Sequence, residues 1–271
     1  MSENVAVTVS GTVRSADGTT IEYEKVGSGP ALVLVDGALC FRDFGSCRSL
    51  AELLADRFTV YFYDRRGRGG SGDTAPYAPA REYEDLEAVI RAAGGDASVL
   101  GFSSGAALAL QAAASGVPMR RLASYEAPYV GIAPVNGVTP DHLGHLKGLI
   151  AKGDRGGAVD YFLVKMVGGP AFLPIMMRMM PKAWKQLKAV AHTLVYDTTI
   201  MDGFEVPTQT LARITVPTLV MGGSKAKPNM AAAVAAVAHA VPGAQRRTLK
   251  GQTHQVKDAA IAPEVIEFFR A

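Results

Sequence analysis

The chain is poor in cysteine and in aromatic residues. It has two cysteines, Cys40 and Cys47, a single tryptophan, and only 7% aromatic residues among its 271 positions. Two cysteines are too few for a disulfide framework or a cysteine-based zinc site. Residues 1–4 also lack the basic stretch, followed by an apolar core, that opens a signal peptide. These absences favour a reduced, cytoplasmic setting.

An excess of charge of one sign is also absent, since 28 Lys and Arg against 25 Asp and Glu leave a formal net charge of +3. The densest basic cluster, Arg65, Arg66 and Arg68, has no ladder of aromatic residues beside it, which favours a solvated or structural turn over nucleic-acid binding. Residues 97–119 are uncharged but contain Gly, Ser, Gln and Pro, so a buried strand and helix are favoured over a membrane span. We expect neither a nucleic-acid partner nor a membrane.

What the chain does contain is a hairpin signal followed by an alternation of apolar runs and helical segments. Residues 5–14 and 20–26 are expected strands joined by a turn at 16–18. The alternation that follows predicts an α/β fold: a doubly wound, mostly parallel sheet flanked by helices. The further expected strands are 31–35, 58–63, 97–100, 122–125, 218–221 and 246–249, and the expected helices are 46–55, 83–93, 229–240 and 263–270.

Residues 131–206 break this alternation, because they contain helical segments separated by Gly and Pro and no clear buried strand. They predict a helical insertion in a core formed by residues 1–130 and 207–271. The helices expected inside it are 140–152, 155–167 and 182–195.

Residues 97–116 are the most informative segment. An apolar run leads into G-F-S-S-G at 101–105, and an Ala- and Leu-rich helix follows. This layout predicts a nucleophile elbow with Ser103 at its apex, flanked by glycines that let strand and helix backbones pass closely. An ordinary glycine-rich connection between strand and helix is the alternative.

A serine hydroxyl becomes a good nucleophile only when a base takes its proton. His254 is the strongest candidate, because it lies in G-Q-T-H at 251–254, between the last expected strand and the last helix. We expect the other histidines to be structural or to lie on an exposed helix face. His142 and His145 are three residues apart, but no carboxylate or cysteine nearby favours a metal pair.

Acyl transfer also needs N–H donors for the developing negative charge on oxygen. We expect one from Ser104, at the start of the helix after the elbow. The other is expected from Ala38, in V-D-G-A-L at 35–39 after the third strand.

Together these segments resemble the α/β-hydrolase fold superfamily, in its serine-nucleophile branch, over nearly the whole chain. The resemblance implies a helical lid over the active site, which corresponds to residues 131–206. Its motifs are G-F-S-S-G at 101–105, Y-D-R-R-G-R-G-G-S-G at 63–72, P-T-L-V-M-G-G at 217–223 and G-Q-T-H at 251–254.

The sequence departs from the family pattern at the acid that orients the histidine. Members usually carry it just after the strand at 218–221, but residues 223–227 hold no carboxylate, and Ala226 stands where Asp is usual. Some members place the acid after the strand that follows the elbow, where this chain has Glu126. We favour Glu126; a Ser–His dyad and a more distant acid such as Asp202 stay open.

A second departure lies in the oxyanion loop, where Asp36-Gly37 replaces the usual His-Gly. Two interpretations of Asp36 stay open. Its carboxylate near the nucleophile would raise the pKa of the base and disfavour anionic substrates, or it would only cap or brace the loop.

A serine with a histidine base predicts attack on an ester, lactone or thioester through an acyl-enzyme, with no metal or organic cofactor needed. The insertion is rich in Met and aromatic residues, which suits a small to medium apolar substrate. The expected pocket residues are Asp36, Phe102, Met166, Met176 and Trp184.

Two other functions stay open. One is a non-catalytic ligand-binding protein on the same fold, which would also lack the acid at the usual position near Ala226 and have an altered oxyanion loop. The other is a lyase or cyclase that uses the same pocket. The Ala-rich helix at 229–240 is either core or contact surface, so a homodimer stays open as well.

Overall fold

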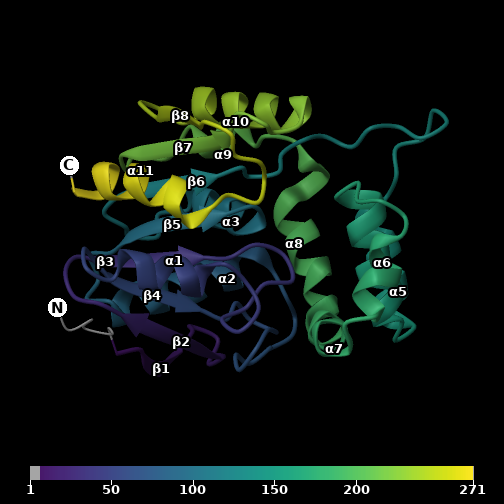
Figure 1. The fold of residues 1–271 in the computed structure, drawn as a ribbon, viewed down its shortest axis with the longest axis horizontal. Helices are drawn as coiled ribbons and strands as arrows, with labels where there is room; N and C mark the ends of the chain where they lie inside the picture. The colour runs from purple at the N-terminus through teal and green to yellow at the C-terminus, as the bar shows by residue number, and fades with distance from the viewer. Residues whose placement is uncertain (1–6, 271) are drawn as a thin grey trace.

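The computed structural model describes residues 7–270, and its centre is an eight-stranded sheet in the order β1-β2-β4-β3-β5-β6-β7-β8 (Figure 1). β1 pairs antiparallel with β2, and β2 with β4, whereas every later pair is parallel. The predicted fold class is confirmed. The strands are β1 Val9–Arg14, β2 Thr20–Val26, β3 Ala31–Val35, β4 Thr59–Tyr63, β5 Ser98–Phe102, β6 Leu122–Tyr125, β7 Thr218–Gly223 and β8 Gln245–Leu249.

Three of the strand predictions have the bounds that the structure shows. The expected strands at 20–26, 31–35 and 122–125 match β2, β3 and β6 residue for residue. The hairpin turn between β1 and β2 contains Gly18 at a φ of 83°, a left-handed conformation that glycine adopts without a steric cost. The beginning of the first expected strand, residues 5–6, lies outside the described part of the chain.

Helices cover both faces of the sheet, as Figure 1 shows. Side chains of β3 alternate between the two layers: Val33 and Val35 join one hydrophobic core, and Leu32 and Leu34 join the other. The first layer is closed by α2 Pro79–Ala92, α3 Ser104–Ala114 and α10 Pro228–Ala240, and the second by α1 Cys47–Leu54 and α11 Asp258–Arg270. The last helix begins five residues before its expected start at Pro263, which lies inside it.

Between β6 and β7 the described chain forms helices and loops, with an isolated β-bridge between Val135 and Val138. The expected helix at 155–167 ends in a π-helical segment, and the one at 182–195 divides into two helices around a 3-10 turn at 191–193. The elements are α4 His142–Ala151, α5 Arg155–Tyr161, the π-helical segment Phe162–Met166, α6 Leu173–Arg178, α7 Pro181–Val190, α8 Leu194–Met201, a 3-10 turn Asp202–Phe204 and, beyond residue 206, α9 Thr208–Leu211.

The helical insertion has a small hydrophobic core of its own, which includes Leu146, Val159, Leu187 and Leu194. Leu39, from the loop after β3, joins this core. In Figure 1, α5, α6 and α7 stand to one side of the sheet, and α8, which packs against α2, α3 and α4, lies between them and the sheet. None of the helices among residues 7–270 is long and apolar enough to cross a membrane.

Candidate active site

Ser103 occupies the sharp turn between β5 and α3, with φ 52° and ψ −124°. A non-glycine residue in such a conformation costs about 1–3 kcal/mol, which the surrounding structure must offset. A Cβ added to Gly101 would lie 2.5 Å from the Gly105 carbonyl oxygen, and one added to Gly105 would lie 2.5 Å from the Asp36 carbonyl oxygen. The two glycines are therefore needed for close backbone approach, as the sequence predicts.

A continuous chain of hydrogen bonds connects Ser103, His254 and Glu126. The Ser103 Oγ lies 3.1 Å from His254 Nε2, and His254 Nδ1 lies 2.8 Å from Glu126 Oε2. A carboxylate accepts only, so it selects the tautomer with the proton on Nδ1 and leaves Nε2 free to accept from the serine. The structure thus brings together the three side chains that the sequence nominates.

Glu126 follows β6 in a left-handed conformation, with φ 46°, and its side chain is fully buried. Its second oxygen, Oε1, accepts a hydrogen bond of 2.7 Å from the Gly223 N–H at the end of β7. Asp202, the other acid considered, is exposed after α8. Ala226, at the usual position of the acid, lines the cavity described below.

The histidine loop, residues 251–254, is held against the ends of β6 and β7. The Tyr125 hydroxyl donates to the Thr253 carbonyl at 2.5 Å, and the Lys225 N–H donates to the Gln252 carbonyl at 2.9 Å. A Cβ on Gly223 would collide with the Gln252 backbone, so glycine at the end of β7 is what lets this loop approach.

The two expected oxyanion donors, the N–H groups of Ala38 and Ser104, belong to residues near Ser103. Ser104 follows Ser103 in the chain. A Cβ built on Gly37 would lie 3.1 Å from the Ser103 Cβ, and Ala38 follows Gly37 in the same loop. Within residues 7–270, neither the Ala38 N–H nor the Ser104 N–H donates to a protein acceptor. Both residues line the cavity. Unpaired N–H groups on residues beside a nucleophile are candidate donors to an oxyanion.

The side chain of Asp36, in the loop after β3, is buried and does not line the cavity, contrary to its expected place in the pocket. Its Oδ1 accepts from the Gly37 N–H at 2.8 Å, so the carboxylate braces the loop. Its Oδ2 is buried and has no hydrogen-bond partner among residues 7–270. Burial raises the pKa of Asp36 above its ordinary value, against the opposing hydrogen bond from Gly37.

A cavity of about 560 Å³ opens beside Ser103 and His254, between the core and the insertion. Met166 lines it, as predicted. Most of its other lining is apolar, and Lys225, Lys227 and Asn229 add polar groups from the segment after β7. The apolar lining includes Val130, Ile132, Phe162, Val167, Met201, Phe204 and Met230.

Three other expected pocket residues lie elsewhere. Phe102 belongs to the hydrophobic core under α1 and α11, because it points to the face of the sheet opposite α3. Met176, on α6, is 46% exposed. Trp184, on α7, carries the Arg178 guanidinium 4.7 Å from its ring and lines a separate depression. The insertion folds around its own core, which turns these two residues away from the serine.

His142 lines the cavity, which the sequence analysis missed. Its Nδ1 lies 2.9 Å from the Tyr161 hydroxyl, and burial lowers its pKa. His145 instead stacks on Tyr161, at 4.0 Å between ring centres. Among the described residues, no group of three or more His, Cys, Asp or Glu side chains is arranged to hold a metal ion.

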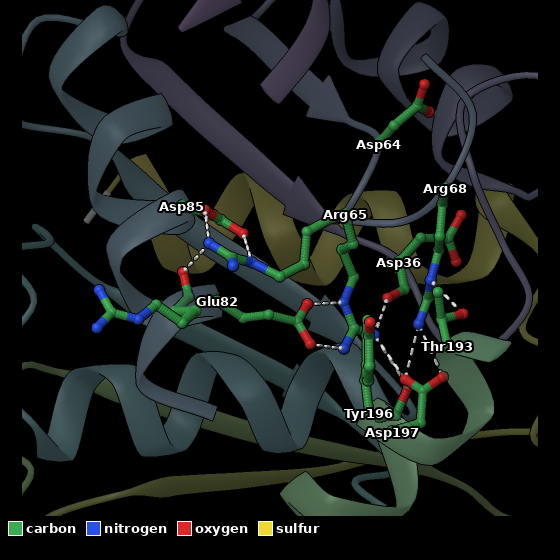
Figure 2. A network of polar contacts seen from close by, with 12 residues as sticks. Asp36, Asp64, Arg65, Arg68, Glu82, Asp85, Thr193, Tyr196 and Asp197 are labelled. Carbon is green, nitrogen blue, oxygen red and sulfur yellow. Dashed lines mark hydrogen bonds and ion pairs between the residues drawn. The ribbon is translucent and has the colours of Figure 1, made fainter. Parts of the chain in front are cut away.

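The basic cluster after β4 is expected from the sequence to be either a solvated or a structural turn. Its three arginines are buried, which confirms the structural turn. Arg65, Arg66 and Arg68 are each at most 1% exposed. Arg66 forms a bidentate ion pair with Asp85, and Arg65 and Arg68 both bond to Asp197 of α8, which lines the cavity (Figure 2).

Residues 28–265 match the sequence profile of the alpha/beta hydrolase family. The chain belongs to this family. It is 49% identical to an alpha/beta hydrolase from Sphaerobacter thermophilus of known crystal structure, over 96% of this chain and 100% of that one, with a TM-score of 0.86. Membership of the alpha/beta hydrolase family places the chain among the hydrolases.

More distant solved structures share the fold. The 2-hydroxy-6-oxo-6-phenylhexa-2,4-dienoate hydrolase of a Rhodococcus strain is 19% identical, with a TM-score of 0.70 over 98% of this chain and 100% of that one. The enol-lactonase of Burkholderia xenovorans is also 19% identical, with a TM-score of 0.72 over 96% and 100% of the two chains. No curated protein matches the chain by sequence.

Proposed function

We propose that this alpha/beta hydrolase is a cofactor-independent serine hydrolase that cleaves small to medium apolar carboxylic esters or lactones through an acyl-enzyme. The observation that carries the proposal is the chain of hydrogen bonds from Ser103 through His254 to the buried Glu126. In this proposal Ser103 is the nucleophile, His254 the general base and Glu126 the acid that orients it.

In the first step the Ser103 Oγ attacks the carbonyl carbon while its proton passes to His254 Nε2. The carbonyl oxygen becomes an oxyanion, which accepts hydrogen bonds from the Ala38 and Ser104 N–H groups. The intermediate collapses, the C–O bond to the leaving group breaks, and the imidazolium protonates the departing alcohol oxygen. Water then attacks the acyl-enzyme with His254 again acting as base, and the acid product leaves.

The cavity supports the proposed substrate class. Its volume of about 560 Å³ and its apolar lining suit a small to medium acyl group. We propose that the helical insertion, residues 131–206, acts as a lid, since Phe162 and Met166 from it line the same cavity as the serine. The enol-lactonase shares this fold, so lactones belong in the substrate screen beside esters.

The test is intact-mass spectrometry after treatment with a fluorophosphonate, followed by a screen of 4-nitrophenyl esters and simple lactones. We expect the wild type to gain one phosphonyl group and to hydrolyse short esters, and the folded Ser103→Ala variant to do neither. A folded wild type that is not labelled would favour the ligand-binding function. Turnover that survives Ser103→Ala would favour lyase or cyclase chemistry.

A further inference from the structure

Asp197 lies where the insertion meets the active site, and its carboxylate bonds to three side chains of the core (Figure 2). Its Oδ1 accepts from Arg65 Nη1 at 2.8 Å, from Arg68 Nη2 at 2.9 Å and from the Ser104 hydroxyl at 2.8 Å. Its Oδ2 accepts from Arg68 Nη2 at 2.7 Å. All four residues are buried, so solvent screens these contacts little.

The charges in this cluster depend on one another. Arg65 also pairs with Glu82, at 2.7 Å and 2.9 Å. For Arg68, Asp197 is the one carboxylate in ion-pair contact among residues 7–270. Burial alone would raise the pKa of Asp197, but the guanidinium groups of Arg68 and Arg65 outweigh it and hold the pKa below its ordinary value.

Arg68 connects Asp197 to the first oxyanion donor. Its Nη1 donates to the Gly37 carbonyl oxygen at 2.5 Å and to the Cys40 carbonyl oxygen at 3.2 Å. The Gly37–Ala38 peptide is trans, so its C=O and N–H point in opposite directions. By holding the Gly37 carbonyl, Arg68 therefore fixes the direction of the Ala38 N–H.

Ser104 connects Asp197 to the second donor. Its hydroxyl bonds to the Asp197 carboxylate, while its backbone N–H is the expected donor at the start of α3. Arg65 Nη1 also donates to the Ser104 hydroxyl oxygen at 3.2 Å and, more weakly, to the Asp36 carbonyl oxygen at 3.4 Å. The cluster thus reaches both elements that supply oxyanion donors.

We propose that Asp197 is a positioning residue for the oxyanion hole: through Arg68 it orients the Ala38 N–H, and through the hydroxyl of Ser104 it holds the other donor. The inference rests on the proposed serine-hydrolase function. It also assigns a role to the insertion, because α8 supplies Asp197 and the core of the insertion receives Leu39 from the oxyanion loop.

The test compares Asp197→Asn with Asp85→Asn. Asp85 is an equally buried carboxylate that forms a bidentate pair, 2.7 Å on both sides, with Arg66 of the same loop, but it does not line the cavity. Each variant is assayed for thermal stability, for kcat and KM with 4-nitrophenyl butanoate, and for inhibition by a phenylboronic acid. Boron adds to the Ser103 Oγ as its proton passes to the histidine, which gives a tetrahedral anion with an oxygen in the oxyanion hole.

Loss of an oxyanion donor costs about 10²–10³ in kcat, and a displaced donor costs less. We expect Asp197→Asn to lower kcat about 10- to 100-fold, to leave KM nearly unchanged, and to weaken the boronic acid by a similar factor. Asp85→Asn should lower the melting temperature but leave kcat and the affinity for the boronic acid close to those of the wild type. If Asp197→Asn does not fold, the same measurements on Ser104→Ala test the inference, since this variant removes only one hydroxyl. Its control is Ser124→Ala, at a buried serine of β6.

Two results would overturn the inference. Folded Asp197→Asn or Ser104→Ala with the kcat and boronic-acid affinity of its control would show that the cluster is only structural. A higher KM with unchanged boronic-acid affinity would assign Asp197 to substrate binding instead. Measurements on the wild type distinguish these two results from a failure of the proposed function. If the wild type neither hydrolyses the ester nor binds the boronic acid, the serine-hydrolase proposal is wrong, and the inference that rests on it is wrong too.

Discussion

Glu126→Gln isolates the charge of the proposed triad acid with little change of shape. In the structure, one carboxylate oxygen accepts from the Gly223 N–H and the other faces His254 Nδ1. A glutamine keeps the first bond through its carbonyl oxygen and turns its NH₂ toward the histidine. Nδ1 must then accept, which moves the proton to Nε2, the atom that should take the serine proton.

The expected loss is large because the wrong tautomer removes the base. Neutralising the acid of a Ser–His–Asp triad lowers kcat about 10⁴-fold, or about 5.5 kcal/mol at ~1.4 kcal/mol per factor of ten. We expect a loss of about 10³- to 10⁴-fold for Glu126→Gln. Stability should not fall, since the bond to the Gly223 N–H survives and a fully buried charge disappears.

The assay is stopped-flow acylation with 4-nitrophenyl butanoate, beside the melting temperature of each variant. Glu126→Asp is the companion variant: it keeps the charge but is one methylene shorter, so it cannot reach both Gly223 and His254, and we expect an intermediate rate. A folded Glu126→Gln protein that retains more than about a tenth of the wild-type acylation rate would refute the reasoning. The Ser–His dyad would then be the better description.

Three further predictions concern the supports of the site. Gly223→Ala places a Cβ against the Gln252 backbone, so the histidine loop must shift; we expect a loss of about 1–3 kcal/mol of stability and at least about tenfold in kcat, measured by urea unfolding and ester hydrolysis. Tyr125→Phe removes the hydroxyl that holds the Thr253 carbonyl and should cost about 1 kcal/mol and a few-fold in kcat, by the same two measurements. Because burial raises the pKa of Asp36, its carboxyl group binds a proton more tightly in the folded protein than in the unfolded chain. Asp36→Asn should therefore be more stable than the wild type at pH 8, by about 1.4 kcal/mol for each unit of the difference between the folded and unfolded pKa. Urea unfolding should show this stability difference shrinking as the pH falls toward about 4.5.

The sequence predicts the parts of the site that local chemistry determines. Ser103 lies in a strand–turn–helix whose small residues are required by close backbone contacts, and those contacts are present. Glu126 follows the buried strand β6 and His254 follows β8 at the end of the sheet, and because both strands are parallel to β5, their carboxyl ends meet at the edge where Ser103 lies. β3 is predicted residue for residue because it is buried on both faces and its apolar run is continuous.

The sequence could not predict which residues of the insertion face the cavity. Met166, Met176 and Trp184 are all large and apolar, but the first lines the cavity, the second is largely exposed, and the third packs in a separate depression. Hydrophobicity indicates that a residue can be buried, not which surface buries it. Asp197 was missed for another reason: its partner Arg68 is 129 residues away, and no local motif connects them.

The position of the acid also changes what the end of β7 does. The family resemblance leads us to expect a carboxylate at this strand end, but here the Gly223 N–H donates to the carboxylate of Glu126, which follows β6. The residues after Gly223 contact other parts of the chain: the Lys225 N–H donates to the Gln252 carbonyl of the histidine loop, and Lys227 Nζ donates to the Val167 carbonyl of the insertion at 3.2 Å. Both lysines and the intervening Ala226 line the cavity. Gly223 therefore serves both sides of the proposed site: its missing side chain lets the histidine loop approach, and its N–H holds the Glu126 carboxylate.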